Sequence, residues 1–496
     1  MDNKKLLFVT KFEELGFDAV RSLLVLRKAA LEHIVFITVI ERDRVAMRRG
    51  QMNVVAGSSA LGLARTHEML WAFLPAEGDT EADADGRVKE IDALPAAVRE
   101  PLLPLVSPKR LDETEALGRL GWRDSKGFAQ VENYFQRKLD WIIRHQNEWS
   151  RWGGLLDWGG VRSIYEVYRS TTIPGEWFKF LGRHGWHNSE VDIPNHVMYH
   201  YLRSGDRRIF HFYESMIRHQ MDVDTIHVNL PEFERPGHEW EEGQWTRGGQ
   251  HRHSYDHYSG GPNIGHTWNE GLGNYYFLTG DRRAYDVALE VGEYSLGQPE
   301  GQVPGAFEKW TTHRNETQRF SRSASNAYRI ALKCYELTGD ERWKRESLRW
   351  REHFLANSPA YLDKQAATFH VTTYLVRTLA LDYHVFRDPR VGEELVRIAR
   401  WHCDHMRRGY DERGLHYPYL ACGTAWWIAR DDDLLAWPWH TYLHECQSPV
   451  AKCQKPSDFR QSHFYEFGQL PFFLRACREA GYTESSPPAK PRKGEE

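Results

Sequence analysis

The sequence predicts a mainly α-helical protein, an (α/α) toroid of helical hairpins preceded by a small α/β piece. Three observations support this fold class. A Tyr-x-x-Ser/Thr-Gly-Asp motif recurs along the chain, apolar residues follow helical spacing from about residue 130 to about residue 480, and the first 40 residues alternate strand-like and helix-like patterns. Repeated hairpins of antiparallel helices form either an open solenoid or a closed toroid.

The repeated motif is explained physically as the turn of a helical hairpin. One helix ends, glycine takes the left-handed position after it, and aspartate caps the start of the next helix. We therefore expect Asp206, Asp281 and Asp340 each to begin a helix after a left-handed glycine. The motif occupies residues 201–206, 276–281 and 335–340, and more loosely 383–388.

Shorter patterns predict the elements on either side of the toroid. Residues 6–10 and 34–40 are apolar, as in strands, and residues 12–30 are amphipathic at helical spacing. This β-α-β unit resembles the opening of a universal stress protein domain. The glycine-rich nucleotide loop of that family has only a faint counterpart at 57–65, so we do not expect the chain to bind ATP. The predicted divisions are the β-α-β unit (1–50), an irregular or β remnant with a linker (51–125), the catalytic toroid (126–482) and a disordered tail (483–496).

The composition narrows the class of ligand. Hydrophobic residues make up 41% of the chain and charged residues 27%, as in an ordinary soluble globular protein. A net charge of −4 supplies no basic field for nucleic acid. The chain holds 19 Trp, 23 Tyr and 23 Phe, and flat aromatic faces stack on sugar rings, which favours an oligosaccharide as partner. Whether the chain forms a homo-oligomer stays open.

Targeting signals and cysteine usage predict a cytoplasmic protein. No apolar stretch of signal-peptide type follows the charged start, and the most apolar run, 34–40, is too short to cross a membrane. All six cysteines lie in the last third of the chain, without a Cys-x-x-Cys pair. This pattern predicts reduced thiols, with a Cys446–Cys453 disulfide as the weaker alternative.

One loop is rich in groups that move protons. Residues 251–271 hold four histidines, and the Gly- and Pro-containing stretch 259–265 excludes a helix interior. Imidazole titrates near neutral pH and a tyrosine with a lowered pKa transfers protons, so the loop predicts an active site. A structural hydrogen-bond network is the alternative. The candidates are His253, Tyr255, His257 and His266 for catalysis, and Arg252, Tyr258, Trp268 and Glu270 for substrate binding.

Two further patches carry similar residues beside predicted helix ends, and a shorter segment at 312–316 extends them. Residues 183–196 and 218–229 are rich in His, Asp and Asn. Such positions meet on one rim of a toroid, so we expect the patches to share one cavity, although each alone is equally well explained as structural. The further candidates are His187 and Asn188 for catalysis, and Trp186, Arg218, Asp222, Asp224, His227 and Arg314 for substrate binding.

Longer motifs stand in a fixed order between about residues 151 and 290. They include Trp-Gly-Gly-Leu-Leu-Asp-Trp-Gly (152–159), Trp-His-Asn-Ser-Glu-Val-Asp (186–192) and Arg-His-Gln-Met-Asp-Val-Asp-Thr-Ile-His (218–227). In order and spacing this region resembles the central helical domain of the exo-rhamnogalacturonan lyase-like (YetA-like) family. The resemblance implies an (α/α) toroid that cleaves uronic-acid-containing saccharides by β-elimination.

Elimination beside a uronate carboxylate needs a group that neutralises the carboxylate, a base that takes the α-proton and an acid that protonates the leaving oxygen. Asn188 or Arg252 suits the first role, since amide and guanidinium donors bind carboxylate oxygens. His253 or His257 suits the base. Tyr255 or Tyr258 suits the acid. This chemistry requires no cofactor.

Three alternatives stay open at this point. A glycoside hydrolase would use two carboxylates about 5–10 Å apart, and Asp256 and Glu270 are available for it. A divalent cation is a second alternative, since the histidines of 251–266 and Asp256 are suitable ligands. The third is a helical-repeat protein that binds a partner in a groove without catalysis.

Overall fold

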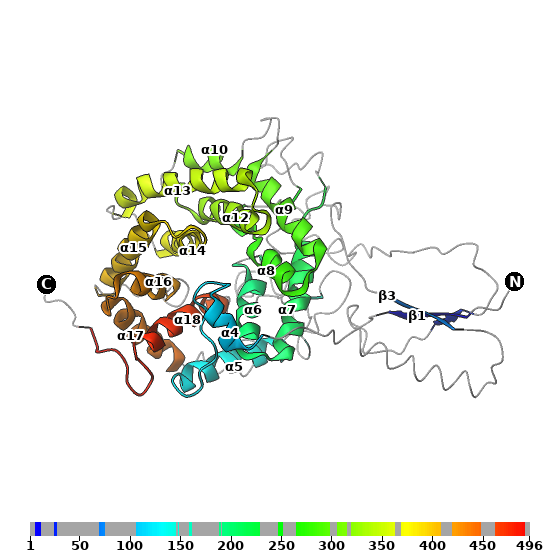
Figure 1. Ribbon diagram of the computed structural model, residues 1–496, viewed down its shortest axis with the longest axis horizontal. Helices are drawn as coiled ribbons and strands as arrows, with labels where there is room; N and C mark the ends of the chain where they lie inside the picture. Colours follow the sequence, from blue (N-terminus) through cyan, green and yellow to red (C-terminus); the bar gives the residue numbers. More distant parts are fainter. Residues whose placement is uncertain are drawn as a thin grey trace, which may run out of the picture.

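The computed structural model describes residues 5–10, 24–26, 69–74, 106–144, 147, 158–160, 188–189, 191–228, 247–250, 264–297, 305–314, 319–362, 369–407, 419–447 and 462–491. Twelve helices within this described part form two concentric rings (Figure 1). The inner ring consists of α6 (Ile193–Ser204), α8 (Glu270–Thr279), α12 (Arg322–Thr338), α14 (Phe369–Phe386), α16 (Tyr419–Ala429) and α18 (Ser462–Glu479). The outer ring consists of α5 (Ala129–Arg144), α7 (Arg207–His219), α9 (Arg282–Leu296), α13 (Glu341–Leu362), α15 (Pro389–Arg407) and α17 (Asp433–Gln447).

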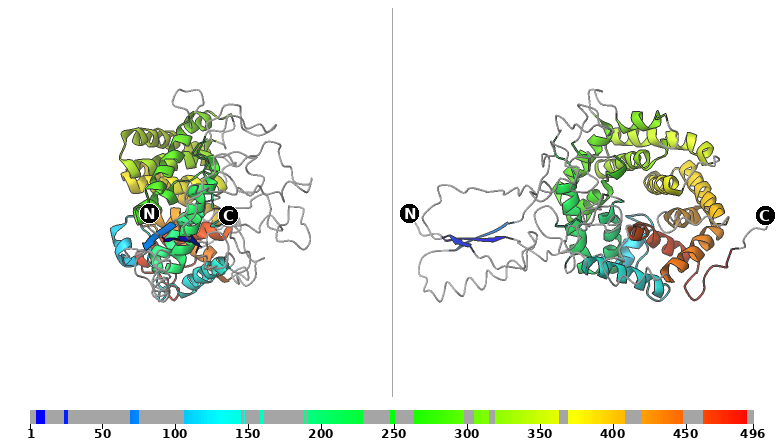
Figure 2. Two further views of the ribbon diagram at one scale, coloured as in Figure 1. Left: turned by 90° about the vertical axis from the view of Figure 1, so that its right-hand side faces the viewer. Right: turned by 180° about the vertical axis from the view of Figure 1, so that it is seen from behind.

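The inner ring is closed. Each inner helix contacts the next one around the ring, and the last inner helix, α18, packs against the first, α6. Figure 2 shows the same ring from the side and from behind. The predicted (α/α) toroid is therefore confirmed, since an open solenoid would leave α6 and α18 apart.

The two rims of the toroid differ in their connections. Every inner helix from α6 to α16 leads into its outer partner through a short turn, and we call this side the turn rim. Every outer helix leads back to the next inner helix through a longer segment, so the inner helices all begin on the opposite side, the N-terminal rim. The three patches found in the sequence all precede inner helices or follow outer ones. The topology therefore brings the described parts of these patches to the N-terminal rim.

The predicted turn chemistry is confirmed. Gly205, Gly280 and Gly339 have φ of 71°, 74° and 66°, and the N–H of each donates to the carbonyl four residues earlier over 2.7 Å. The side chains of Asp206, Asp281 and Asp340 then accept backbone N–H groups at the start of the next helix. These helix ends require left-handed backbone, which glycine adopts without strain.

Two turns keep this geometry without glycine. Arg387, in the loose fourth copy, has a φ of 55°, and Asp388 accepts the N–H of Arg390. The turn between α16 and α17 is a fifth copy that the sequence analysis missed. Its Arg430 has a φ of 51° and donates its N–H to Trp426, where the other copies have tyrosine.

The toroid begins earlier in the chain than the boundary at residue 126 that the sequence suggested. Helix α4 (Pro108–Thr114) packs against α6 and forms ion pairs from Asp112 to Arg475 and Arg478 of α18. Gly121 accepts a hydrogen bond from Arg203 of α6 over 2.6 Å. Residues 106–125 therefore belong to the packed ring, because charged side chains of the inner helices bind them.

The segment after α18 is also ordered up to residue 491, where its composition suggested disorder. Residue Glu484 reaches the start of α5, and its two carboxylate oxygens accept the N–H groups of Gln130 and Val131, each over 2.9 Å. An anion at a helix N-terminus satisfies unpaired N–H groups and interacts favourably with the helix dipole. This contact joins the last part of the ring to its first helix.

We expect Glu484→Gln to lower the free energy of unfolding by about 1 kcal/mol, since the amide loses the charge and one of the two acceptors. Urea unfolding of the purified protein measures this change. Glu113→Gln is the matched control, because the Glu113 side chain is 46% exposed and its ion pairs at 3.6 and 3.9 Å stabilise little. Equal stabilities of the two variants would contradict the role of Glu484 in closing the ring.

The N-terminal region contains three described strands. Strand β1 (Lys5–Thr10) pairs in antiparallel fashion with β2 (Leu24–Leu26) on one side and β3 (Met69–Leu74) on the other. The strand predicted at 6–10 is therefore present. The helix predicted over 12–30 is wrong at Leu24–Leu26, where an unbroken apolar run pairs with β1. The strand predicted at 34–40 lies outside the described residues.

Candidate active site

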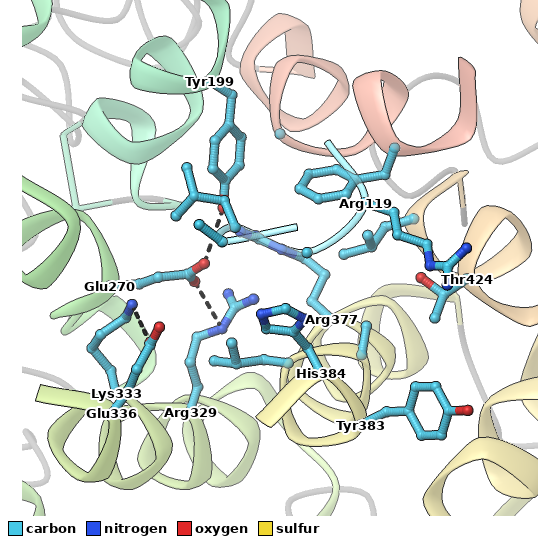
Figure 3. A pocket seen from close by; sticks show the side chains of 18 of the residues that line it. Arg119, Tyr199, Glu270, Arg329, Lys333, Glu336, Arg377, Tyr383, His384 and Thr424 are labelled. Carbon is cyan, nitrogen blue, oxygen red and sulfur yellow. Dashed lines mark hydrogen bonds and ion pairs between the residues drawn. The ribbon is translucent and has the colours of Figure 1, made fainter. Parts of the chain in front are cut away.

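The inner ring encloses a cavity of about 130 Å³. All six inner helices line it, together with residues 116–119, which lie between α4 and α5. Figure 3 shows the side chains that converge on it. The charged and hydrogen-bonding groups among its lining residues are Arg119, Tyr199, Glu270, Asn274, Arg329, Lys333, Glu336, Arg377, Tyr383, His384, Arg387 and Thr424.

Helix geometry explains why charged residues reach the centre. Arg329, Lys333 and Glu336 follow one another at spacings of four and three residues, so they share one face of α12. The other faces of α12 pack against neighbouring helices. The charged face therefore points into the cavity, where the side chains of Arg329 and Lys333 are only 5% and 2% exposed.

The cavity wall has more positive than negative charge among its buried groups. Arg329 pairs with Glu270 over 3.2 Å, and Lys333 pairs with Glu336. Arg377 of α14 is also buried, and its Nη2 contacts the neutral acceptor Nε2 of His196 over 2.7 Å. Its Nη1 has no hydrogen-bond partner among the described residues. A buried guanidinium with a free donor attracts an anion, because an unpaired charge is costly away from water.

A glycine makes room for the support of Arg377. A Cβ atom on Gly468 of α18 would lie 2.3 Å from the imidazole of His196. Arg377 also lies over Trp268, with the guanidinium carbon 5.7 Å from the ring centre, as does Arg329 at the same distance. His196 and Trp268 therefore hold Arg377 in place, and burial and then Arg329 lower its pKa to about 10.

Tyr199 and Glu270 form a hydrogen-bonded pair beside these cations. The Tyr199 hydroxyl donates to Oε1 of Glu270 over 3.0 Å (Figure 3). Burial and then Glu270 raise the pKa of Tyr199 well above its ordinary value, so its phenol keeps its proton at neutral pH. Burial opposes ionisation of Glu270, but Arg329, Lys333 and Arg377 outweigh it and lower the pKa of that carboxyl. The pair is thus a protonated phenol beside a carboxylate.

His384 supplies a neutral imidazole to the same cavity. Burial and then Arg387 lower the pKa of His384 below its ordinary value. An unprotonated imidazole accepts a proton, whereas the phenol of Tyr199 donates one. The cavity therefore combines a cationic wall, a proton acceptor and a proton donor.

Asp192 lies behind Glu270 as the residue before α6. It is fully buried with a φ of 60°, and its Oδ2 accepts the N–H of Gly271 over 2.9 Å. Burial and then Glu270 raise the pKa of Asp192 to about 7. Asp192 and Glu270 are therefore two neighbouring carboxyls whose pKa values are shifted in opposite directions.

The raised pKa of Asp192 predicts a pH-dependent stability. Between its ordinary value of 3.8 and about 7, the folded protein holds a proton on Asp192 that the unfolded chain has lost. This contribution to stability is full at low pH and is lost as pH rises through 7. We expect Asp192→Asn to have the same free energy of unfolding as the native protein near pH 4. Above pH 7 the variant should be more stable than the native protein, by roughly 1.4 kcal/mol for each unit by which the pKa of Asp192 is raised.

Asparagine suits this position because it tolerates left-handed backbone and can still accept from Gly271. Urea midpoints at several pH values measure the difference between the variant and the native protein. Asp286→Asn is the control, since the Asp286 side chain is 58% exposed. A difference for Asp192→Asn that does not change with pH would contradict the assignment.

The described ends of the three sequence patches meet in a buried polar network on the N-terminal rim. Asn188 donates to Gly159 and Met216 and contacts His219, which pairs with Asp224 over 3.0 Å. Trp268 donates its indole N–H to Ser189 over 2.7 Å, and its backbone N–H and carbonyl bond to the Gln250 side chain. A Cβ atom on Gly159 would overlap the carbonyl of Ser215, which explains why the 152–159 motif ends in glycine.

The remaining described candidates occupy different places. Glu270 lines the cavity and Trp268 is buried beside Arg329 and Arg377, whereas Asn188, Asp224 and His266 are buried and do not line it. Asp222 binds Arg283 of α9, His227 binds Glu290 of α9, Arg218 pairs with Glu214, and Arg314 is exposed. Outside the described residues lie Trp186, His187, Arg252, His253, Tyr255, His257 and Tyr258.

The sequence analysis selected Glu270 but none of the other charged and hydrogen-bonding groups that line the cavity. A signal for them exists, because Arg377 is the only Lys or Arg within the largely apolar α14, and α12 carries a charged stripe between two hairpin turns. In a closed ring such a stripe faces the centre. The missed residues that matter most for the chemistry of the cavity are Tyr199, Arg329, Lys333, Arg377 and His384.

Metal, membrane and disulfide features complete the description. Within the described residues, no group of three His, Cys, Asp or Glu side chains is arranged to hold a metal ion, while His251, His253 and His257 lie outside them. No helix found there has the length and apolar character of a membrane span. Cys334, Cys403, Cys422 and Cys477 are buried free thiols, and the side chains of Cys446 and Cys453 lie outside the described part.

Comparison with known proteins places this toroid in a family. Residues 101–385 match the model of the PcRGLX-like protein C-terminal alpha/alpha toroid domain. The chain belongs to the PcRGLX-like family. The match begins before α4 and ends within α14, so helices α15 to α18 of the ring lie beyond it.

A relative of the PcRGLX-like chain is the Bacillus subtilis (strain 168) protein named Uncharacterized protein YetA. The two sequences are 24% identical over 444 residues, which cover 80% of this chain and 47% of the relative. The chain therefore spans about half the length of the curated relative that it matches. The family resemblance noted in the sequence is confirmed at the level of the toroid domain.

Proposed function

We propose that this PcRGLX-like chain is a lyase that cleaves uronic-acid-containing saccharides of the rhamnogalacturonan type by β-elimination. The observation that carries the proposal is Arg377, a buried guanidinium on the cavity wall with an unpartnered Nη1. A uronate carboxylate is an anion of the right charge and geometry for it. The family, which is named after a rhamnogalacturonan lyase-like protein, supports the same class of reaction.

Arg377 and Arg329 would neutralise the uronate carboxylate. Both lie over the ring of Trp268, and Arg329 already binds one carboxylate, that of Glu270. Withdrawing negative charge from the substrate carboxylate makes the adjacent C–H bond acidic, and fixed donors in a buried site do this more effectively than water. This role replaces the one that the sequence analysis gave to Asn188, which is bound to backbone carbonyls.

His384 and Tyr199 would carry the proton transfers. His384 takes the α-proton, the electron pair of the broken C–H bond forms the C=C bond, and the C–O bond breaks with its electrons going to the oxygen of the leaving sugar. Tyr199 gives its proton to the leaving oxygen, and His384 later returns a proton to the phenolate through solvent. His253 and Tyr255, which the sequence hypothesis chose for these roles, lie outside the described residues and remain proposals.

The second candidate function is a glycoside hydrolase that uses Asp192 and Glu270. Their oppositely shifted pKa values favour it, because a protonated and an ionised carboxyl side by side are the acid and base of such enzymes. Asp192 does not line the cavity, however, and Glu270 is held by Arg329 and Tyr199. We therefore rank the lyase first.

The deciding experiment incubates the purified chain with galacturonan, rhamnogalacturonan and their oligomers. A lyase forms a C=C bond conjugated to the carboxylate, which absorbs in the ultraviolet and is detected by mass as an unhydrated product. A hydrolase forms only new reducing ends, with one water added for each cleavage. Products that all contain the added water would contradict the lyase.

A further inference from the structure

A continuous chain of hydrogen bonds crosses the cavity wall from Lys333 to Glu270. Lys333 Nζ donates to Oδ1 of Asn274 over 2.8 Å, and Asn274 Nδ2 donates to Oδ1 of Asn195 over 2.9 Å. Asn195 Nδ2 then donates to the Tyr199 hydroxyl over 3.1 Å, and the hydroxyl donates to Glu270 over 3.0 Å. The chain joins α12, α8 and α6.

The two ends of this chain fix its direction. An ammonium group has only donors, and an ionised carboxylate has only acceptors. Lys333 therefore requires Asn274 to turn its amide oxygen toward the ammonium group. The Asn274 amide nitrogen then faces Asn195, which must in turn present its own amide oxygen to that donor. As a result Asn195 can offer only its N–H to Tyr199, and the Tyr199 proton must turn toward Glu270 or the cavity.

We propose that Lys333 and Asn274 are positioning residues that lock the Asn195 amide so that it donates to Tyr199 in every step of the reaction. This inference rests on the proposed function, in which Tyr199 gives its proton to the leaving oxygen. The resulting phenolate gains negative charge, and an N–H donor held toward it stabilises that charge. A flipped amide would place a carbonyl oxygen there and oppose the transfer.

The surroundings of Tyr199 leave this task to Asn195. The ionisable groups that interact with the phenol from neighbouring helices include Tyr213, Glu270, Arg329 and Arg377. Among these, Arg329 already pairs with Glu270, and Arg377 contacts His196. On α18, Phe472 packs against the Tyr199 ring and offers no hydrogen bond from its side chain.

Asn274→Asp tests the proposal with almost no change in shape. Aspartate keeps the contact with Lys333 but cannot donate to Asn195, so the Asn195 amide turns and presents its oxygen to Tyr199. We expect turnover to fall by about 10²-fold, the effect of losing one donor to a developing anion. KM for galacturonan oligomers should change little, and the alkaline limb of the pH–rate profile should move to higher pH. Asn357→Asp on the exposed face of α13 is the control and should retain full activity.

Two further measurements separate this proposal from a general structural effect. In the Tyr199→Phe variant, adding Asn274→Asp should cause no further fall in turnover. If the two substitutions lower turnover independently, so that their effects add, the proposal is overturned. The ring-¹³C NMR signal of Tyr199, identified by its loss in Tyr199→Phe, should shift in Asn274→Asp and not in the control. This signal is read without substrate. If no unsaturated product is formed by the native protein, the proposed function fails while the amide lock is still tested, and an unshifted signal overturns it.

Discussion

Replacing Arg377 with methionine is expected to lower kcat/KM on uronate-containing oligosaccharides by about 10²–10³-fold, the usual effect of removing a donor to developing charge. Methionine fills similar space without charge, so Trp268 and the neighbouring helices keep their packing. Both binding and turnover should suffer, because the carboxylate is bound in the ground state and carries more charge in the transition state. Steady-state kinetics on galacturonan oligomers measure the loss.

The matched controls separate charge from geometry. Arg377→Lys keeps the charge but loses the planar fork, so it should recover only part of the activity. Gly468→Ala keeps the Arg377 side chain, but the added methyl group would displace the imidazole of His196. Because His196 contacts Arg377, the guanidinium should shift as well and activity should fall by roughly 10-fold. Arg342→Met, at a side chain that is 46% exposed, should behave as the native protein.

The result also bears on which anion the cavity binds. Loss of binding to free galacturonate in Arg377→Met, measured by calorimetry, is expected alongside the kinetic loss. A variant that binds galacturonate as the native protein does would show that the carboxylate lies elsewhere. Arg252, which the sequence analysis proposed for the carboxylate, would then become the better candidate.

The toroid was predictable from the sequence because its turns are local. Glycine in left-handed backbone and aspartate at a helix start interact with residues only a few positions away, so they leave a repeated signature. The turn at Arg430 escaped notice because arginine and tryptophan replace two of the signature residues while the hydrogen bond from residue 430 to Trp426 persists. The contact of Glu484 with α5 joins segments about 350 residues apart, and no local pattern signals it.

The cavity was less predictable for a related reason. The sequence shows clusters of histidine and aspartate most clearly, and these clusters favoured the segments near the N-terminal rim as the site. There Asn188 and Asp224 instead form part of a buried hydrogen-bond network. The cavity groups instead come from helices that lie far apart in the sequence. Tyr199, Arg329 and Arg377 come together only when the ring closes, so the three-dimensional structure is needed to show that they line one cavity.

Replacing Tyr199 with phenylalanine is expected to lower kcat by ~10²–10⁴-fold, the usual effect of removing a positioned acid or base. KM should change little, since the lost proton transfer belongs to the transition state. The variant removes one oxygen atom and keeps the ring that packs against Phe472. Circular dichroism and urea unfolding should show that the fold is intact.

The same assay decides between two tyrosines and two mechanisms. His253→Ala and Tyr255→Phe carry the same expected loss under the hypothesis drawn from the sequence, but one elimination needs only one acid. A large loss in Tyr199→Phe with a nearly silent Tyr255→Phe therefore assigns the chemistry to the cavity, and the reverse assigns it to the segment 251–271.

Glu270→Gln should be milder than either tyrosine variant in a lyase, because the amide oxygen still accepts the Tyr199 hydrogen bond. In a hydrolase the order is inverted, since the carboxylate itself reacts and an amide cannot replace it. If Glu270→Gln and Asp256→Asn, or Glu270→Gln and Asp192→Asn, abolish cleavage while both tyrosine variants stay active, the paired-carboxylate hydrolase is the better account. The arrangement of Tyr199 beside an Arg-paired Glu270 favours the first outcome, because a carboxyl group whose pKa is lowered by three cations is a poor base and holds no proton to donate at neutral pH.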